Sequence, residues 1–187
     1  MLQFIKFKPD KIVRLNHQKS DQGFTLLEVL LVVFMISILA AMGIPSWIAL
    51  LNNTRLKTAR ANVSGAIREA QTTAKQRKAS FTVSFQQNGD SVQWAVHSGA
   101  DPTNWQTIDV PSIQIDTENT TLGGNTASPW SITFDEKGQV VENPSGEVTA
   151  PSKITVSMQN NEGLKKCVIV QTILGAMTTE DGNKCAE

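Results

Sequence analysis

An uninterrupted apolar segment dominates the first third of the chain. Val29–Leu51 spans 23 residues, broken in character only by two serines and Pro45, and no charged side chain occurs between Glu28 and Arg55. A helix of about 20 apolar residues crosses the hydrocarbon core of a bilayer. The pattern therefore predicts a transmembrane helix in this segment.

The helical period continues beyond the apolar segment. Apolar or small residues recur at the spacing of one helix face, at Leu56, Ala59, Val63, Ala66, Ile67, Ala70 and Ala74. Charged side chains fall largely between them, so residues 52–78 are predicted to form an amphipathic second half that packs on a head domain. We expect one long helix that runs from Phe24 to about Lys75.

Pro45 is the one strong helix breaker inside this long helix. A proline in a helix interior removes a backbone hydrogen bond and clashes with the preceding turn. The sequence predicts either a kink or a locally melted stretch near Gly43 and Ile44.

After Ala79 the period of the pattern changes from 3.6 to 2, which predicts strands. Phe81–Phe85 and Val92–Val96 alternate on either side of Asn88-Gly89, a pair that accepts the positive φ of a tight turn, and so predict a β-hairpin. Further strands are predicted at Ile108–Ile115, Ser131–Phe134, Gln139–Glu142, Lys153–Gln159 and Lys165–Ile173. Pro111 either confines the first of these to the edge of a sheet or interrupts it. The head, residues 79–187, is expected to be a small antiparallel β-sheet domain, which gives an α+β fold.

The charges are distributed unevenly along the chain. The totals of 17 basic and 17 acidic residues balance, but residues 79–187 carry five basic and thirteen acidic residues, a net charge of −8. Residues 1–23 form a basic leader with five lysines or arginines against two aspartates. Nucleic-acid binding draws most of its affinity from cations that neutralise phosphates, so the acidic head disfavours it.

The two cysteines, Cys167 and Cys185, are separated by 17 residues near the C-terminus. In an oxidising compartment they would form one disulfide, and in a reducing one they would remain free thiols. A zinc site is not expected, because the chain has only two histidines, His17 and His97, far apart in sequence. No nucleotide-binding, hydrolase or metalloprotease motif is present, so we expect neither a cofactor nor an enzyme.

The start of the apolar segment resembles a known family. A short basic leader ends in Gly23, Phe24 follows, Glu28 lies four residues after that Phe, and a long apolar helix contains Pro45. This arrangement resembles the superfamily of type IV pilins and type II secretion pseudopilins. The resemblance implies that a prepilin peptidase cleaves between Gly23 and Phe24 and methylates the new amino terminus. It also implies that the helix unfolds around Pro45 within the filament.

Glu28 is the one acidic residue near the apolar segment. A charged side chain inside a membrane span costs roughly 2.5 to 3.5 kcal/mol and marks a functional position by default. The resemblance implies that Glu28 faces the ammonium of Phe24 on a neighbouring subunit, and pairing removes much of the penalty of burying either charge alone. The alternative is an interfacial charge that snorkels to the lipid headgroups.

The second half of the chain resembles the minor-pseudopilin family of GspH and FimT proteins. The resemblance lies in Ile132–Gly138, Lys153–Ser157, Lys165–Val170 and Leu174-Gly175. Some FimT-like members bind DNA through arginines directly after the glycine that corresponds to Gly175, where this chain has Ala176-Met177-Thr178. The nearby cations that remain as candidate DNA contacts are Lys165, Lys166 and Lys184.

These observations favour a structural assembly subunit over two alternatives. The chain is expected to have a cleaved leader (1–23), an assembly helix (24–51), an amphipathic half (52–78) and a periplasmic head (79–187). Its implied partners are other pilin or pseudopilin subunits, the prepilin peptidase and an assembly platform at the bacterial inner membrane. The alternatives are a FimT-like DNA-binding minor pilin for natural transformation and a membrane-tethered periplasmic enzyme.

Overall fold

The computed structural model describes residues 23–99, 101–122, 128–141, 151–159 and 161–186. The chain divides into two compact units, residues 1–43 and 44–187. The predicted leader, apart from Gly23, lies outside the described residues, as does Glu142 at the end of one predicted strand.

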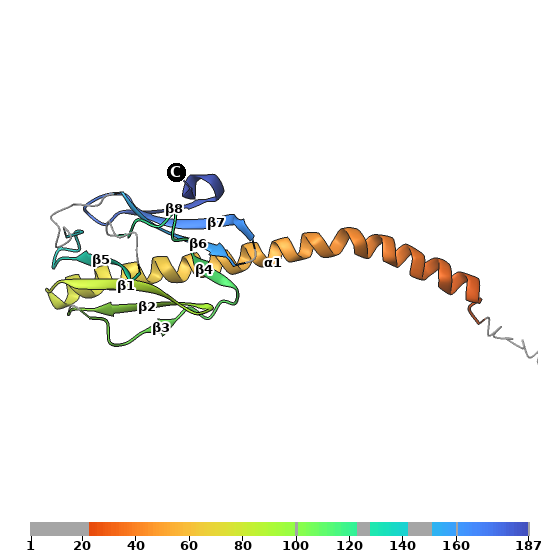
Figure 1. The fold of residues 1–187 in the computed structure, drawn as a ribbon, viewed down its shortest axis with the longest axis horizontal. Helices are drawn as coiled ribbons and strands as arrows, with labels where there is room; N and C mark the ends of the chain where they lie inside the picture. Colours follow the sequence, from red (N-terminus) through yellow and green to blue (C-terminus); the bar gives the residue numbers. More distant parts are fainter. Residues whose placement is uncertain (1–22, 100, 123–127, 142–150, 160, 187) are drawn as a thin grey trace, which may run out of the picture. The chain divides into compact units, whose positions relative to one another are not determined.

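One continuous helix, α1 (Leu26–Arg77), accounts for 52 residues (Figure 1). Its bounds confirm the predicted long helix to within two residues at each end. The helix also continues through Pro45 without a break, so the expectation of a melted stretch there is wrong for the single subunit. A proline removes only one backbone donor, and strong helix formers lie on either side of this region, Ala40–Met42 before it and Ala49–Leu51 after it. The alternative of a kink stays a prediction.

The C-terminal end of α1 is closed by a turn of left-handed backbone. Lys78 has a φ of 51°, and the Ala79 N–H donates to the Ala74 carbonyl oxygen at 3.3 Å. Ala79 is the second residue after the helix, and a hydrogen bond from this position back to the last turn is typical of a Schellman motif. The bond satisfies a carbonyl group that has no partner within the helix. The motif ends the helix and directs the chain into the first strand.

The second half of α1 buries one face. Its buried residues are Leu56, Ala59, Val63, Ala66, Ile67, Ala70 and Ala74, the same seven that the helical period predicts. Small alanines dominate this face, so the sheets can approach the helix backbone closely. The amphipathic half therefore packs on the head as expected.

The first sheet holds the predicted hairpin. Its strands, in the order β3-β2-β1-β5, are β3 (Gln106–Thr107), β2 (Ser91–His97), β1 (Phe81–Asn88) and β5 (Trp130–Phe134), all antiparallel. The β1–β2 turn consists of Gly89 and Asp90, one residue later than predicted, because Asn88 still pairs with Ser91. Gly89 has a φ of 57°, which suits glycine at the first central position of a hairpin turn.

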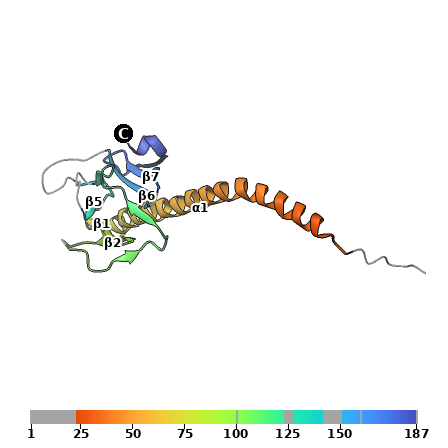
Figure 2. The same ribbon diagram turned by 45° about the vertical axis from the view of Figure 1, so that its right-hand side comes forward.

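The second sheet contains the C-terminal strands. Its order is β4 (Ile113–Ile115), β6 (Ser152–Met158), β7 (Asn161–Val170) and β8 (Met177–Asp181), again antiparallel, and the 3₁₀ helix η2 (Gly182–Cys185) follows. In both ribbon views the two sheets flank the second half of α1 (Figure 2). Residues from both sheets and from α1 form one buried cluster around Trp130, Phe85 and Phe134.

The segment Ile108–Ile115 is interrupted at Pro111, which is one of the two predicted outcomes. The chain turns near Pro111 and Ser112 (φ 61°), so only Ile113–Ile115 forms a strand, β4. Two other features of the head differ from the predictions. In the described part of the predicted strand Gln139–Glu142, Val140 forms an isolated β-bridge with Phe134, and no strand is assigned. Strand β8 was not predicted, because its sequence is polar and its pairing with β7 alone makes it a strand.

Candidate assembly interface

The residues at the predicted processing site lie together at the start of α1. Gly23, Phe24, Thr25 and Glu28 line one open hollow, and Phe24 is 80% exposed. Residues 23–25 are not helical, so the bond between Gly23 and Phe24 precedes the first turn. The structure therefore brings together three of the predicted site residues, Gly23, Phe24 and Glu28.

The side chain of Thr25 caps the N-terminus of α1. The Glu28 N–H donates to Thr25 Oγ1 at 3.2 Å, and the Val29 N–H donates to the Thr25 carbonyl oxygen at 3.2 Å. A threonine followed three residues later by glutamate is the sequence signature of a capping box, so the local sequence already carries this signal. An acidic side chain is also stabilised near the positive end of the helix dipole. The group of Glu28 that bonds Thr25 is its backbone N–H, so what its side chain adds within its own helix is a negative charge near the positive end of the dipole.

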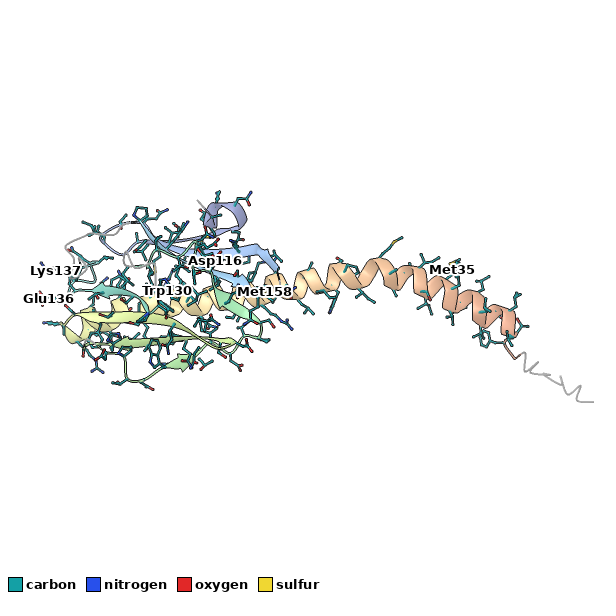
Figure 3. All side chains as sticks on the ribbon, viewed as in Figure 1. Met35, Asp116, Trp130, Glu136, Lys137 and Met158 are labelled. Carbon is teal, nitrogen blue, oxygen red and sulfur yellow. A yellow bond between two sulfur atoms is a disulfide. The ribbon has the colours of Figure 1, made fainter. Side chains whose placement is uncertain are left out.

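The apolar side chains from Phe24 to Leu51 are unpartnered in the single chain. The exposed fractions of the large ones range from 42% at Leu51 to 83% at Leu26, and Met35 projects outward among them (Figure 3). The most apolar window of α1 has a mean hydropathy of 2.6, and none of it is buried, so this helix is long and apolar enough to cross a membrane. Such a surface requires cover by lipid or by other helices.

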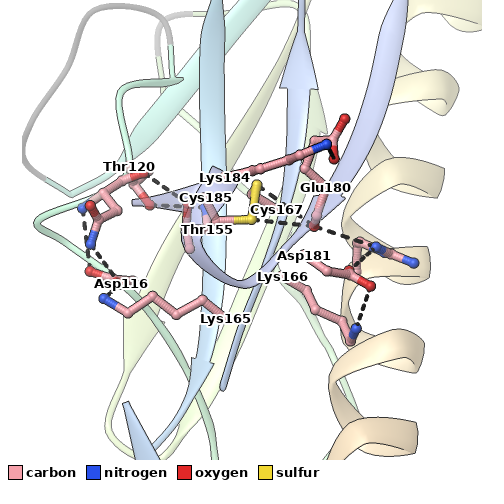
Figure 4. Close-up of a disulfide and its surroundings, with 12 residues drawn as sticks. Asp116, Thr120, Thr155, Lys165, Lys166, Cys167, Glu180, Asp181, Lys184 and Cys185 are labelled. Carbon is pink, nitrogen blue, oxygen red and sulfur yellow. Dashed lines mark hydrogen bonds and ion pairs between the residues drawn. A yellow bond between two sulfur atoms is a disulfide. The ribbon is translucent and has the colours of Figure 1, made fainter. Parts of the chain in front are cut away.

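The three candidate DNA-contact lysines each pair with a carboxylate. Lys165 Nζ lies 2.6 Å from Asp116 Oδ2, Lys166 Nζ lies 2.9 Å from Asp181 Oδ2, and Lys184 Nζ lies 3.3 Å from Glu180 Oε2. Lys165 and Lys166 are neighbours in β7, so their side chains leave opposite faces of the sheet (Figure 4). Each candidate cation therefore lies beside a carboxylate that offsets its charge, and a DNA contact by these lysines stays a prediction.

Asp181 joins the C-terminal strand to α1. Its carboxylate accepts from Arg60 of the helix and from Lys166 of β7, and Arg60 also donates to the Glu180 carbonyl oxygen at 3.5 Å (Figure 4). Partial burial raises the pKa of Asp181, but the hydrogen bond from Lys166 and the charges of Arg60, Lys166 and Lys57 outweigh it and lower the pKa. These contacts hold β8 against the helix.

Asp116 is the second paired carboxylate. Besides Lys165, it accepts hydrogen bonds from the backbone and side-chain nitrogens of Asn119, the latter at 3.0 Å. Desolvation raises its pKa, but the hydrogen bonds from Lys165 and Asn119 and the charge of Lys165 outweigh that effect, so the pKa is lowered. The ionised form is therefore favoured in the folded head.

Replacing Asp116 with asparagine should flatten the acid side of the stability profile of the head. Because the folded-state pKa is lowered, the carboxylate contributes stability above the unfolded value of about 3.9, and this contribution is lost as the pH falls through the lower folded-state pKa. We expect Asp116→Asn to lower the free energy of unfolding at pH 7 by about 1.5 to 3 kcal/mol, the range for hydrogen bonds to charged groups. The variant should lose less stability than the wild type between about pH 5 and pH 2.

Denaturant titrations across this pH range would measure the effect. Asp109→Asn serves as the control, because it removes an exposed carboxylate on the loop after β3. If Asp116→Asn and Asp109→Asn gave the same pH profile, the Asp116–Lys165 pair would not contribute to the acid sensitivity of the head.

The predicted disulfide is present between Cys167 of β7 and Cys185 of η2. The two Cα atoms are 5.6 Å apart and both side chains are fully buried. The bond ties the C-terminal segment to the centre of the second sheet, beside the Arg60–Asp181–Lys166 contacts (Figure 4).

The contact between Ser84 and His97 in the head resembles part of a catalytic site. Ser84 Oγ lies 2.9 Å from His97 Nε2, and His97 Nδ1 lies 2.6 Å from the Gly99 carbonyl oxygen. A serine, a base and a group that orients the base resemble an activated nucleophile. However, Ser84 is only 2% exposed in the middle of β1, so a substrate cannot reach its hydroxyl. Within the described ranges, no three His, Cys, Asp or Glu side chains form a group that could hold a metal ion.

Comparison with known proteins gives one motif match. Residues 18–44 match the prokaryotic N-terminal methylation motif, a segment that contains Gly23, Phe24, Glu28 and the first turns of α1. No curated protein is significantly similar in sequence to the chain. The motif covers the predicted processing site and most of the exposed apolar helix.

Two solved structures resemble the chain in fold. Both are crystal structures of the type IV minor pilin FimU from Pseudomonas aeruginosa strain PAO1, in space groups P21 and P65. The first is 11% identical, covers 68% of this chain and 89% of FimU, and has a TM-score of 0.47. The second is 13% identical, covers 67% and 92%, and has a TM-score of 0.44. At such low identities and scores, the likeness by itself carries no conclusion about function.

Proposed function

We propose that this chain, which belongs to the type IV pilin and pseudopilin superfamily, is a minor subunit that assembles through α1 into a type IV pilus or a type II secretion pseudopilus. The observation that carries the proposal is the methylation motif at residues 18–44, which opens a helix with fully unpartnered apolar side chains. A helix of this kind is stable in a bilayer and in a bundle of similar helices. The chemistry is assembly, not catalysis.

In this proposal a prepilin peptidase cleaves between Gly23 and Phe24 and methylates the amino group of Phe24. The bond lies in non-helical backbone ahead of α1, and nothing described lies within 4 Å of a Cβ placed on Gly23, which supports access by the peptidase. The freed ammonium of Phe24 would then lie one helical turn from the Glu28 carboxylate of its own chain and could reach that of a neighbour.

The pairing of Glu28 with Phe24 of a neighbouring subunit gives the assembly a direction. Lipid tails are as apolar as leucine, so moving α1 from lipid to a helix bundle supplies little hydrophobic free energy. A buried carboxylate and a buried ammonium are each unfavourable alone and compensate each other when paired. The pair therefore favours the filament over the free subunit and fixes the register of the helices.

The proposed subunit is anchored in the bacterial inner membrane with its head in the periplasm before assembly. The disulfide between Cys167 and Cys185 suits such an oxidising compartment. An assembly platform and other pilin or pseudopilin subunits are its proposed partners. The sequence resemblance of Ile132–Gly138 and Lys165–Val170 favours the GspH and FimT branch, but the paired lysines and the residues after Gly175 do not favour DNA binding.

Intact mass spectrometry of the chain extracted from membranes tests the proposal. We expect the mass of residues 24–187 with one added methyl group and with two hydrogens fewer for the disulfide. Gly23→Val serves as the control, because a bulky residue at the cleavage site should leave the leader attached and prevent assembly. A functional mature chain that retained its first 23 residues would contradict the proposal.

A further inference from the structure

The described part of the head exposes one apolar patch. Among the large apolar side chains of the described head, the exposed ones are Val141, Ile173 and Leu174, with exposed fractions of 39%, 52% and 64%. They lie together, because the Val140 N–H donates to the Ile173 carbonyl oxygen at 2.7 Å. Clustered exposed aliphatic side chains on a soluble domain commonly mark an interaction surface.

The turn that carries Ile173 and Leu174 is held in one conformation. Gly175 has a φ of 76°, its N–H donates to the Thr172 carbonyl oxygen at 2.9 Å, and the Gln171 N–H donates to the Ala176 carbonyl oxygen at 2.8 Å. These bonds close the connection between β7 and β8. The two apolar side chains therefore project from a preorganised turn, which reduces the entropy lost when a partner binds.

Gln71 of α1 fixes this turn to the helix. Its Nε2 donates to the Leu174 carbonyl oxygen at 3.3 Å and to the Gly138 carbonyl oxygen at 2.9 Å. A Cβ at Gly175 would lie only 2.4 Å from the same Gln71 nitrogen, so glycine is required for this close approach. The apolar patch is thus continuous with the second half of α1.

Neither lipid nor the chain's own apolar segment covers this patch. The exposed apolar residues of α1 that belong to the same compact unit are Ile44, Trp47, Ile48, Leu50 and Leu51. A helix rises 1.5 Å per residue, so Gln71 lies about 30 to 40 Å along the axis from this segment. That distance is about the thickness of a bilayer core, so lipid around Leu51 does not reach Leu174.

We propose that the Ile173–Leu174 turn packs against the apolar helix segment of a second neighbouring pilin or pseudopilin subunit, different from the one whose Phe24 meets Glu28. The segment is the one in the position that Ile44–Leu51 holds in this chain. The contact requires that the two helices run parallel with a displacement of about 30 to 40 Å along their axes. Ile44–Leu51 carries no charge, which matches the aliphatic patch. This inference rests on the proposed function and adds to it a contact between head and helix with a defined stagger.

Site-specific photocrosslinking in living cells tests the contact. Benzoylphenylalanine would replace Leu174, or Leu39 in the assembly helix, or the exposed Thr107 on β3. We expect position 174 to crosslink to another subunit within the region equivalent to residues 44–51, position 39 to crosslink to other helices, and position 107 to give neither product. Crosslinking at position 39 without any at position 174 would overturn this inference alone. Loss of crosslinks at both positions would overturn the proposed function as well.

A charge at the patch supplies a second measurement. Leu174→Asp should reduce incorporation into filaments roughly tenfold to a hundredfold, the equivalent of one leucine left unburied. Because Leu174 is 64% exposed, circular dichroism of the extracted chain should show an unchanged fold. Leu174→Met should incorporate normally, and Thr107→Asp should have no effect. Normal incorporation of Leu174→Asp would overturn the inference.

Discussion

Replacing Glu28 with alanine should abolish incorporation of the chain into filaments while its export and membrane insertion remain intact. In the proposed assembly the variant leaves the Phe24 ammonium of a neighbour buried without a counter-ion. Removing one member of a buried ion pair costs about 3 to 5 kcal/mol, which corresponds to a fall of roughly 100-fold to 1,000-fold or more in assembly. Quantifying the chain in sheared filaments and in the membrane fraction would measure this loss.

The capping contact at Thr25 makes matched controls necessary. The Glu28 backbone N–H that bonds Thr25 is kept in the alanine variant, but the negative charge that the helix dipole favours in the first turn is lost together with the proposed charge pair. Glu28→Gln keeps a residue suited to the capping box but removes the charge, whereas Thr25→Ala removes the cap and keeps the charge. We expect Glu28→Gln to fail in assembly like Glu28→Ala, and Thr25→Ala to lose only about 0.5 to 2 kcal/mol of helix stability. Normal assembly of Glu28→Gln would show that the charge pair does not drive incorporation.

Removing the disulfide should give the largest loss of stability in the head. A closed loop of this size is worth roughly 3 kcal/mol in the chain-entropy model, and loss of a native disulfide from a small domain typically costs about 2 to 5 kcal/mol. The double variant Cys167→Ser and Cys185→Ser also places two hydroxyls where both side chains are fully buried. We expect the free energy of unfolding to fall by at least this amount, as measured by denaturant titration of the extracted chain.

Chemical reduction of the wild type is the control for the disulfide. Reduction breaks the crosslink but introduces no hydroxyl into the core, so the reduced wild type should lose stability, though less than the double variant. The loss should centre on β8 and η2, which hydrogen exchange would show as reduced protection of residues 177–185. An unchanged unfolding midpoint after complete reduction would mean that the ion pairs of Asp181 suffice to hold the C-terminal segment.

Local pattern in the sequence determined the helix and most of the strands. The period of 3.6 depends only on neighbouring residues, so it correctly identified all seven buried residues of α1 from Leu56 to Ala74. The period of 2 likewise identified β1, β2, β5, β6 and most of β7. The leader, Phe24 and Glu28 are enough to indicate the methylation motif, because the motif is contiguous in the chain.

Tertiary structure alone decided the features that depend on distant residues. Strand β8 exists because it pairs with β7, and β3 and β4 belong to different sheets because the chain turns between them at Ser112. Tertiary structure also places a carboxylate beside each lysine near the disulfide, Asp116 beside Lys165 and Asp181 beside Lys166, which the sequence pattern does not reveal. The sequence pattern predicts Ile173 as the end of a strand, but the tight turn at Gly175 exposes both Ile173 and Leu174 instead. Periodicity reports which side of its own element a residue occupies, but it carries no information on what another part of the chain places against that side.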